Sequence, residues 1–232
     1  MESRNGLVVT EHDKRILRDL ALRVVEIAAD PVQKIKADMW RRHNKLERIK
    51  PMVLVFPEGS WREMLPDSAL NCESDFSRGL ERELRVRIYY AEHLPDDNVI
   101  ENIVYSPIVI KHSGWGLEAH STRPEEATGA YHIDPVIHFE ADIEKMTPPD
   151  FTVDWNLTIE TENVMKDLFD DILVVKRRGI GNYGLAPLDH YATLRGIDNM
   201  FMDLVDNPQM VHKAVSRIVD GHISLIKRYE EY

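Results

Sequence analysis

The first 50 residues carry apolar side chains at helical spacing. Four of them recur on one face of a helix: Ile16, Leu20, Val24 and Ile27. Thr10 and Asp13 resemble a capping box at its start. Asp30 followed by Pro31 indicates the start of a second helix, because proline is favoured in the first helical turn. Residues 1–50 are therefore predicted to form a helical N-terminal segment.

Three short apolar stretches predict β-strands. Residues 52–56 (MVLVF) form a continuous apolar run, which is typical of a strand buried on both faces of a parallel sheet. Residues 104–110 and 172–175 predict the second and third strands. Apolar residues at every fourth position after Ser74 predict a helix between the first two. Strands that alternate with helices indicate an α/β fold with a mostly parallel sheet.

Residues 111–150 are rich in glycine and proline, and they are predicted to be mostly loop. A connection of this length is usually functional. A helix around residues 164–169 is predicted before the third strand, and two further helices follow that strand, the second of them starting at Asn207 and Pro208. Only three strands are convincing, whereas a (β/α)₈ barrel needs eight, and the last helix has no glycine stop signal. The pattern predicts the N-terminal portion of a barrel that is incomplete.

Composition narrows the possible partners and compartments. The chain has 232 residues, of which 43% are hydrophobic and 30% charged, and these values are typical of a globular protein. A net charge of −11 argues against a nucleic-acid partner. No apolar run is long enough for a membrane span, and the first residues lack the apolar core of a secretory signal. Cys72 is the only cysteine, which excludes an internal disulfide and favours a cytoplasmic location.

Three stretches resemble the uroporphyrinogen decarboxylase superfamily. They are PMVLVFPEGSWREMLP at 51–66, GAYHIDPVI at 129–137 and DILVVKRRGIGNYGLAPLDHYATLRGIDNMFMDLVDNPQMVH at 171–212. The third is the most specific, with a strand, a glycine turn, an Ala-Pro pair and then helices. The resemblance implies a TIM-type (β/α)₈ barrel, with residues 51–232 as its first part, residues 1–50 as a helical extension and 111–150 as a loop excursion.

The resemblance also implies one of two chemistries. Decarboxylases of this superfamily bind substrate carboxylates with an arginine-containing turn after the first strand, but the matching turn here carries Glu58 and has no arginine before Arg62. A carboxylate would repel a polyanionic substrate. The resemblance therefore favours the corrinoid-dependent methyltransferase branch, which moves a methyl group between a methylated small molecule and a corrinoid protein or thiol. The corrinoid would sit on a partner protein, and zinc would come from a later half of the fold.

Two other functions stay open. The first is that of a uroporphyrinogen decarboxylase that lacks the arginine of the turn. The second is that of a catalytically inactive half-barrel that acts as a binding or assembly module. An incomplete parallel sheet would leave an unpaired strand edge and an exposed apolar face. We therefore expect a homo-oligomer, or completion by a further polypeptide.

The candidate site residues follow predicted strands, because barrel active sites lie at the C-terminal ends of strands. Glu58 and His190 are the candidate catalytic residues, since a buried glutamate or a histidine transfers protons near neutral pH. The candidate substrate-binding residues are Trp61, Arg62, His112, Asn182, Tyr183 and Asp189. The alternative is structural, with Glu58 capping a turn and paired to Arg62, and Asp189 placed at a helix N-terminus by the helix dipole.

Two motifs in the sequence are weaker signals. Residues 179–184 (GIGNYG) match the dinucleotide fingerprint, but two predicted helices follow where that fold needs a strand, so the glycines are expected only to allow close backbone approach. Four histidines lie in the long loop: His112, His120, His132 and His138. Their spacings of eight, twelve and six match no ligand signature, and no metal site is predicted.

Overall fold

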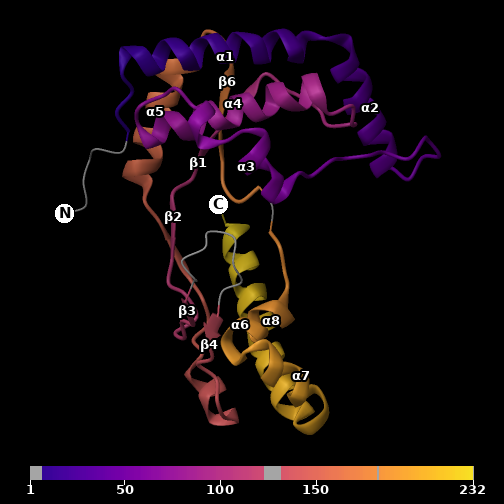
Figure 1. Cartoon of the computed structure of the whole chain (residues 1–232), viewed down its shortest axis with the longest axis vertical. Coiled ribbons are helices and arrows are strands. Elements are labelled where there is room, and N and C mark those ends of the chain that lie inside the picture. The colour runs from indigo at the N-terminus through magenta and orange to yellow at the C-terminus, as the bar shows by residue number, and fades with distance from the viewer. Residues whose placement is uncertain (1–6, 123–131, 182, 232) are drawn as a thin grey trace. The chain divides into compact units, whose positions relative to one another are not determined.

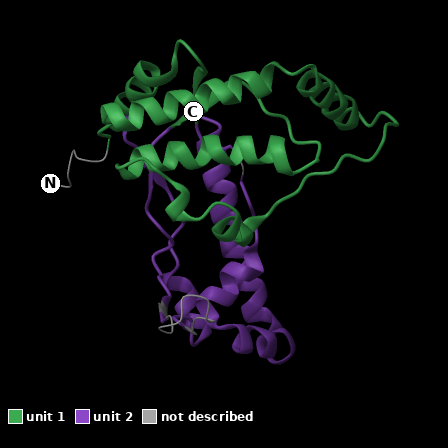
Figure 2. Cartoon of the chain, turned by 45° about the horizontal axis from the view of Figure 1, so that its top comes forward, with its two compact units in different colours: residues 1–107, 156–178 green, residues 108–155, 179–232 purple. Residues whose placement is uncertain are grey.

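The computed structural model describes residues 7–122, 132–181 and 183–231, which divide into two compact units (Figure 2). Unit 1 contains Met1–Pro107 and Asn156–Arg178, and unit 2 contains Ile108–Trp155 and Gly179–Tyr232. The chain therefore passes repeatedly between the units. The sequence predicted a boundary at residue 50, but the two units do not divide there. The N-terminal helices share a core with later parts of unit 1.

Unit 1 is mainly helical (Figure 1). Its helices are α1 (Glu11–Ala29), α2 (Pro31–Asn44), α3 (Trp61–Met64), α4 (Asp75–His93) and α5 (Trp155–Phe169), with 3₁₀ turns η1 (Glu58–Ser60) and η2 (Asp67–Ala69). The expected caps are confirmed, since Thr10 accepts a hydrogen bond from the backbone of Asp13 and Asp30 accepts one from Val32. The long helices α1 and α4 pack together, and the buried faces of α1, α4 and α5 form the core.

One parallel strand pair belongs to unit 1. β1 (Ile103–Pro107) pairs with β6 (Val174–Arg178), so that Val104 lies beside Val175. Val104 is fully buried and Leu173, which precedes β6, is nearly so, and both join the helical core. The second and third predicted strands are therefore confirmed, as is their parallel pairing.

The first predicted strand is not confirmed. Residues 52–56 form neither a helix nor a strand, and Val53, Leu54, Val55 and Phe56 are all exposed. No other strand of the described part of the chain lies beside them, so the apolar run has no sheet in which to bury its side chains. An apolar run forms a buried strand only where a neighbouring strand exists, and the described residues contain no strand beside this run.

Unit 2 combines two antiparallel strand pairs with three helices. β2 (Ile110–His112) pairs with β5 (Phe151–Val153), and β3 (His120–Thr122) pairs with β4 (His132–Asp134). A 3₁₀ turn, η3 (Glu140–Lys145), and α6 (Pro187–Arg195), α7 (Ile197–Asp206) and α8 (Pro208–Tyr229) complete the unit. Its core contains Ile137, Ile143, Met146, Tyr191, Met210 and Ile218. The described parts of residues 111–150 thus combine loops with short elements, some of which pack on α6 and α8.

The architecture is mixed α/β, 58% helical, with only a few short strands. The described ranges contain three two-stranded sheets and no closed barrel, so the TIM-barrel expectation is not confirmed. No helix in these ranges is long and apolar enough to cross a membrane.

Candidate functional site

Four aromatic and histidine side chains meet in unit 2, and we call them the Tyr–His cluster. They are Trp115 from the loop after β2, Tyr183 from the segment before α6, His190 from α6 and His222 from α8. The Trp115 ring centre lies 4.7 Å from that of His190 and 5.1 Å from that of His222. The two imidazole centres are 6.2 Å apart. Segments distant in sequence therefore bring several proton-carrying groups together.

A short hydrogen bond joins Tyr183 to His222. The phenolic oxygen lies 2.5 Å from Nδ1 of the imidazole. Burial lowers the pKa of His222 below its ordinary value and raises the pKa of Tyr183. Both groups are therefore neutral at pH 7, and the bond has two possible tautomers: the phenol donates to Nδ1, or Nδ1–H donates to the phenolic oxygen and the phenol keeps its own proton for a bound molecule. This pair can hold a proton near a reacting atom and return it, which is the task of a general acid or base.

His190 completes the polar part of the cluster. It lies in the first turn of α6 and is half-buried. Burial lowers its pKa, and the neighbouring His222 lowers it further, because two adjacent imidazoles resist becoming charged together. His190 is therefore neutral at pH 7 and offers one donor nitrogen and one acceptor nitrogen to a bound molecule.

An apolar cavity adjoins the cluster through Tyr229 on α8. The Tyr229 ring lies 5.8 Å from that of Tyr183 and stacks on Phe151 at 4.6 Å. Its hydroxyl is 3.4 Å from Nε2 of His112. Tyr229 and Phe151 line a cavity of about 210 Å³, together with Ile108, Ile110, Val153, Gly179 and Ile180. This volume suits a small organic group, and its walls are mostly apolar.

Gly221 explains how Trp115 reaches the helix that carries His222. A Cβ atom at this position would lie 2.5 Å from the Trp115 ring and 2.8 Å from Pro149. Neither neighbour is flexible enough to yield easily, because one is an indole and the other a proline ring. The glycine lets the indole lie directly on α8, beside His222.

We expect Gly221→Ala to destabilise unit 2 although alanine is the better helix former. Alanine gains about 1 kcal/mol of helix propensity, whereas overpacking costs about 1–3 kcal/mol. Thermal or urea unfolding should show a net loss, and Trp115 fluorescence should shift as the indole moves. Gly79→Ala on α4 is the matched control, because nothing lies within 4 Å of its Cβ position, and it should stabilise the protein. A stabilising Gly221→Ala would contradict the close contact.

The structure brings together some of the predicted site residues. Tyr183 and His190 belong to the Tyr–His cluster, and His112 contacts it through Tyr229. Asp189 is exposed on α6, where its carbonyl accepts a hydrogen bond from Thr193. Asn182 lies outside the described residues.

The other predicted site residues lie in unit 1. Glu58 is exposed at the start of η1, with a positive φ of 48°. Trp61 packs edge-on against Tyr89 and Tyr90, with ring centres 5.5 Å apart in both cases, and Arg62 is exposed. We expected Glu58 and His112 to lie at the same end of a barrel. The described ranges contain no barrel.

Two further motifs take ordinary structural roles. Gly179 and Gly184 have room for a Cβ atom and ordinary backbone angles, so the expected close approach at these two glycines is wrong. β6 precedes them, but α6, α7 and α8 follow without a strand, as the sequence indicated. Within the described ranges, no group of three His, Cys, Asp or Glu residues could hold a metal ion.

Sequence reasoning missed His222 and Tyr229 as site residues. They lie seven residues apart on α8, a spacing that places both on one helix face. Gly221 inside a long helix was a further signal, since an interior glycine costs stability and needs a packing reason. Pairing these positions with Tyr183 requires the tertiary structure.

Comparisons with protein-family models, with curated proteins and with solved structures found no match to this chain.

Proposed function

We propose that unit 2 carries part of the substrate site of an enzyme acting on a small organic molecule. The observation that supports this proposal is the hydrogen bond between Tyr183 and His222 inside an aromatic cluster. In the tautomer with hydrogen on Nδ1, His222 donates to the phenolic oxygen and holds it in position, and the phenol delivers its own proton to the substrate. The apolar cavity beside Tyr229 holds the uncharged part of the molecule.

The reaction proposed is methyl transfer between a methylated small molecule and a corrinoid protein or thiol. A neutral acid beside an apolar cavity suits this reaction, since a departing oxygen or nitrogen needs a proton when its methyl group is removed. Decarboxylation of a polyanionic porphyrinogen receives less support, because the four side chains of the Tyr–His cluster include no arginine or lysine, and Arg228 beside the cavity already pairs with Asp150. The proposal places the protein in the cytoplasm, on the reasoning from its single cysteine.

The cofactor in this proposal is a corrinoid carried by a partner protein. Zinc, which the resemblance also implies, does not fit the described part of the chain, where no three-ligand group is present. Burial, with Glu81 as the next cause, raises the pKa of the only thiol, Cys72, to about 12, so this thiol is protonated at neutral pH. No step of the mechanism therefore depends on a metal held by these residues.

We expect Tyr183→Phe to lower turnover about 10²-fold or more, because phenylalanine keeps the ring and removes the proton. The protein would be assayed with methylated amines, ethers and thioethers, a corrinoid or methylcobalamin, and a thiol acceptor. His222→Gln should lower kcat and shift the pH profile, since it removes the group that positions the phenol. Tyr89→Phe is the matched control, because Tyr89 lies in unit 1, and its activity should be unchanged. Full activity in Tyr183→Phe would contradict the proposal, as would an absence of turnover with every substrate in the panel.

A further inference from the structure

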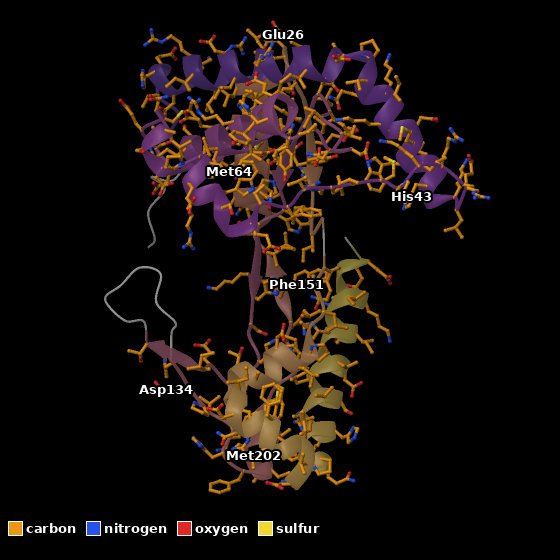
Figure 3. The ribbon with its side chains drawn as sticks, turned by 45° about the vertical axis from the view of Figure 1, so that its right-hand side comes forward. Glu26, His43, Met64, Asp134, Phe151 and Met202 are labelled. Carbon is orange, nitrogen blue, oxygen red and sulfur yellow. The ribbon has the colours of Figure 1, made fainter. Side chains whose placement is uncertain are left out.

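The turn that ends α2 is basic and lies fully in solvent. We call residues 41–48 (RRHNKLER) the basic turn, and every one of its eight residues is exposed. Four cations and one carboxylate, Glu47, give it a net charge of +3, whereas the whole chain carries −11. Figures 1 and 3 show this end of α2, where His43 is labelled, projecting from the rest of unit 1. A local excess of positive charge therefore lies on a projecting part of an acidic chain.

Leu46 occupies the position in this turn that usually belongs to glycine. Its N–H donates to the carbonyl of His43 at 2.9 Å, and the Glu47 N–H donates to the carbonyl of Arg42 at 3.1 Å, which is the pattern of a Schellman motif. The motif requires left-handed backbone angles, and a φ of 60° is unfavourable for leucine. The Leu46 side chain is also 93% exposed, so contacts within the chain offset little of this cost. The combination points to a contact outside the chain.

Hydrogen bonds and ion pairs fix the basic turn on unit 1. The Trp40 indole N–H donates to the carbonyl of Asp97 at 2.7 Å, and the Lys50 ammonium lies 2.8 Å from Oδ1 of the same residue. Trp40 and Lys50 flank the turn, so both of its ends are tied to the loop after α4. An ion pair at 2.8 Å between Arg42 and Glu47 closes the turn itself. The turn is therefore preorganised, and a partner that binds it does not have to order it.

We propose that the basic turn docks unit 1 on the surface of an anionic lipid bilayer. Leu46 inserts among the lipid headgroups, and the cations beside it contact the lipid phosphates. Lys45 and Arg48 have no ion-pair partner in the described part of the chain, and Arg41 has only a long contact with Asp38 at 3.7 Å. An apolar side chain flanked by cations matches the boundary between headgroups and acyl chains, where both kinds of contact are satisfied at once.

A lipid surface fits the basic turn better than other anionic partners do. A specific protein interface involves about 20–30 residues a side, whereas the turn offers eight. A nucleic-acid duplex would have to unstack its bases to accept Leu46, whereas lipid headgroups move apart. The net charge of −11 does not oppose docking, because charges more than about 8 Å away are largely screened at physiological salt and the local charge governs the attraction. The inference goes beyond the proposed catalytic function and does not depend on it.

The first test is co-sedimentation of the full chain with lipid vesicles of two compositions. Vesicles of phosphatidylcholine mixed with phosphatidylserine should bind the chain, and those of phosphatidylcholine alone should bind it at least about tenfold more weakly. Arg48→Gln should lower the binding constant for the mixed vesicles about fivefold, since each cation near an anionic surface contributes about this factor. Arg15→Gln on α1 is the matched control, because Arg15 is also exposed, and it should leave the binding constant unchanged.

The second test separates the apolar contact from the structure of the turn. Leu46→Asn removes the apolar side chain, but asparagine tolerates left-handed angles, so the variant should fold and melt at or above the temperature of the unmodified chain. Its binding constant for the mixed vesicles should fall about tenfold, because the burial of the leucine side chain is lost. Leu22→Asn on α1 makes the same change at a 52% exposed leucine and should leave the binding constant unchanged.

Four results would overturn the proposal. They are an absence of binding to either kind of vesicle, equal binding to both kinds, equal effects of Leu46→Asn and Leu22→Asn, and equal effects of the two arginine variants. A short DNA duplex or polyglutamate that binds the chain as tightly as the mixed vesicles do, at the same ionic strength, would assign the basic turn to another anionic partner and would overturn it as well.

Discussion

Asp203→Ala should lower the unfolding free energy of unit 2 more than any single surface substitution does. Asp203 is buried on α7, and it accepts hydrogen bonds from the Arg195 guanidinium at 2.7 and 3.1 Å and from the Tyr191 hydroxyl at 3.1 Å. Arg195 also donates to the carbonyls of Ile137 and His138, so the group connects α6, α7 and the loop before η3. Removing the carboxylate leaves a cation and a phenol in the interior without their partner.

The expected cost is about 3–5 kcal/mol of unfolding free energy, because one partner of a buried ion pair is lost while the other remains. Hydrogen exchange of the α6–α8 amides measures this loss within unit 2. Asp206→Ala on the same helix is the matched control, since Asp206 is exposed, and it should change stability by less than about 0.5 kcal/mol. Equal losses of unfolding free energy in Asp203→Ala and Asp206→Ala would show that the ion pair between Asp203 and Arg195 contributes nothing.

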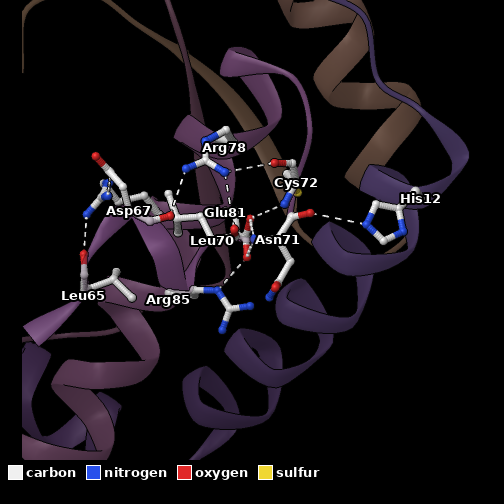
Figure 4. A network of polar contacts seen from close by, with 10 residues as sticks. His12, Leu65, Asp67, Leu70, Asn71, Cys72, Arg78, Glu81 and Arg85 are labelled. Carbon is white, nitrogen blue, oxygen red and sulfur yellow. Dashed lines mark hydrogen bonds and ion pairs between the residues drawn. The ribbon is translucent and has the colours of Figure 1, made fainter.

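Glu81→Ala should have a comparable effect on unit 1. Glu81 is fully buried on α4, where its carboxylate accepts the backbone N–H groups of Asn71 and Cys72 and the Arg85 guanidinium (Figure 4). Arg78 adds bonds to the carbonyls of the same loop. We expect a loss of about 3–5 kcal/mol on the same physical grounds. Glu83→Ala, on a 40% exposed side chain paired with Arg87, should cost less than about 1 kcal/mol.

The pH dependence of unit 1 provides an independent check on Glu81. Burial alone would raise the pKa of this carboxyl, but the hydrogen bonds from Cys72, Asn71 and Arg85 outweigh it and leave the folded-state pKa below 4.5. A lowered folded-state pKa contributes stability at pH values above the unfolded pKa, and this contribution is lost as the pH falls through the folded pKa. Glu81→Gln should therefore be less stable than the unmodified chain at pH 7, and the difference should shrink in acid. A stability difference between Glu81→Gln and the unmodified chain that stays constant from pH 7 into acid would contradict the lowered pKa of Glu81.

Local patterns determined most of the helices of this protein. The caps at Thr10 and Asp30 lie where the sequence placed them, because a cap depends only on a side chain and the next few backbone amides. The same holds for the helix break at Asn207 and Pro208. Two of the three strands were also correct, since residues 103–107 and 174–178 pair with each other and carry Val104 and Val175 to the helical core.

Only the tertiary structure decided which strands find partners and which side chains, among all those drawn in Figure 3, come into contact. Residues 52–56 have the composition of a buried strand, but burial needs a neighbouring strand, and periodicity within one segment contains no information about that neighbour. The Tyr–His cluster has the same origin. Tyr183 and His222 lie 39 positions apart, and their hydrogen bond depends on how α8 packs within unit 2 and on the missing Cβ of Gly221, which lets Trp115 reach the helix. Residue types thus indicated the chemistry available, whereas the packing of distant segments decided where it is assembled.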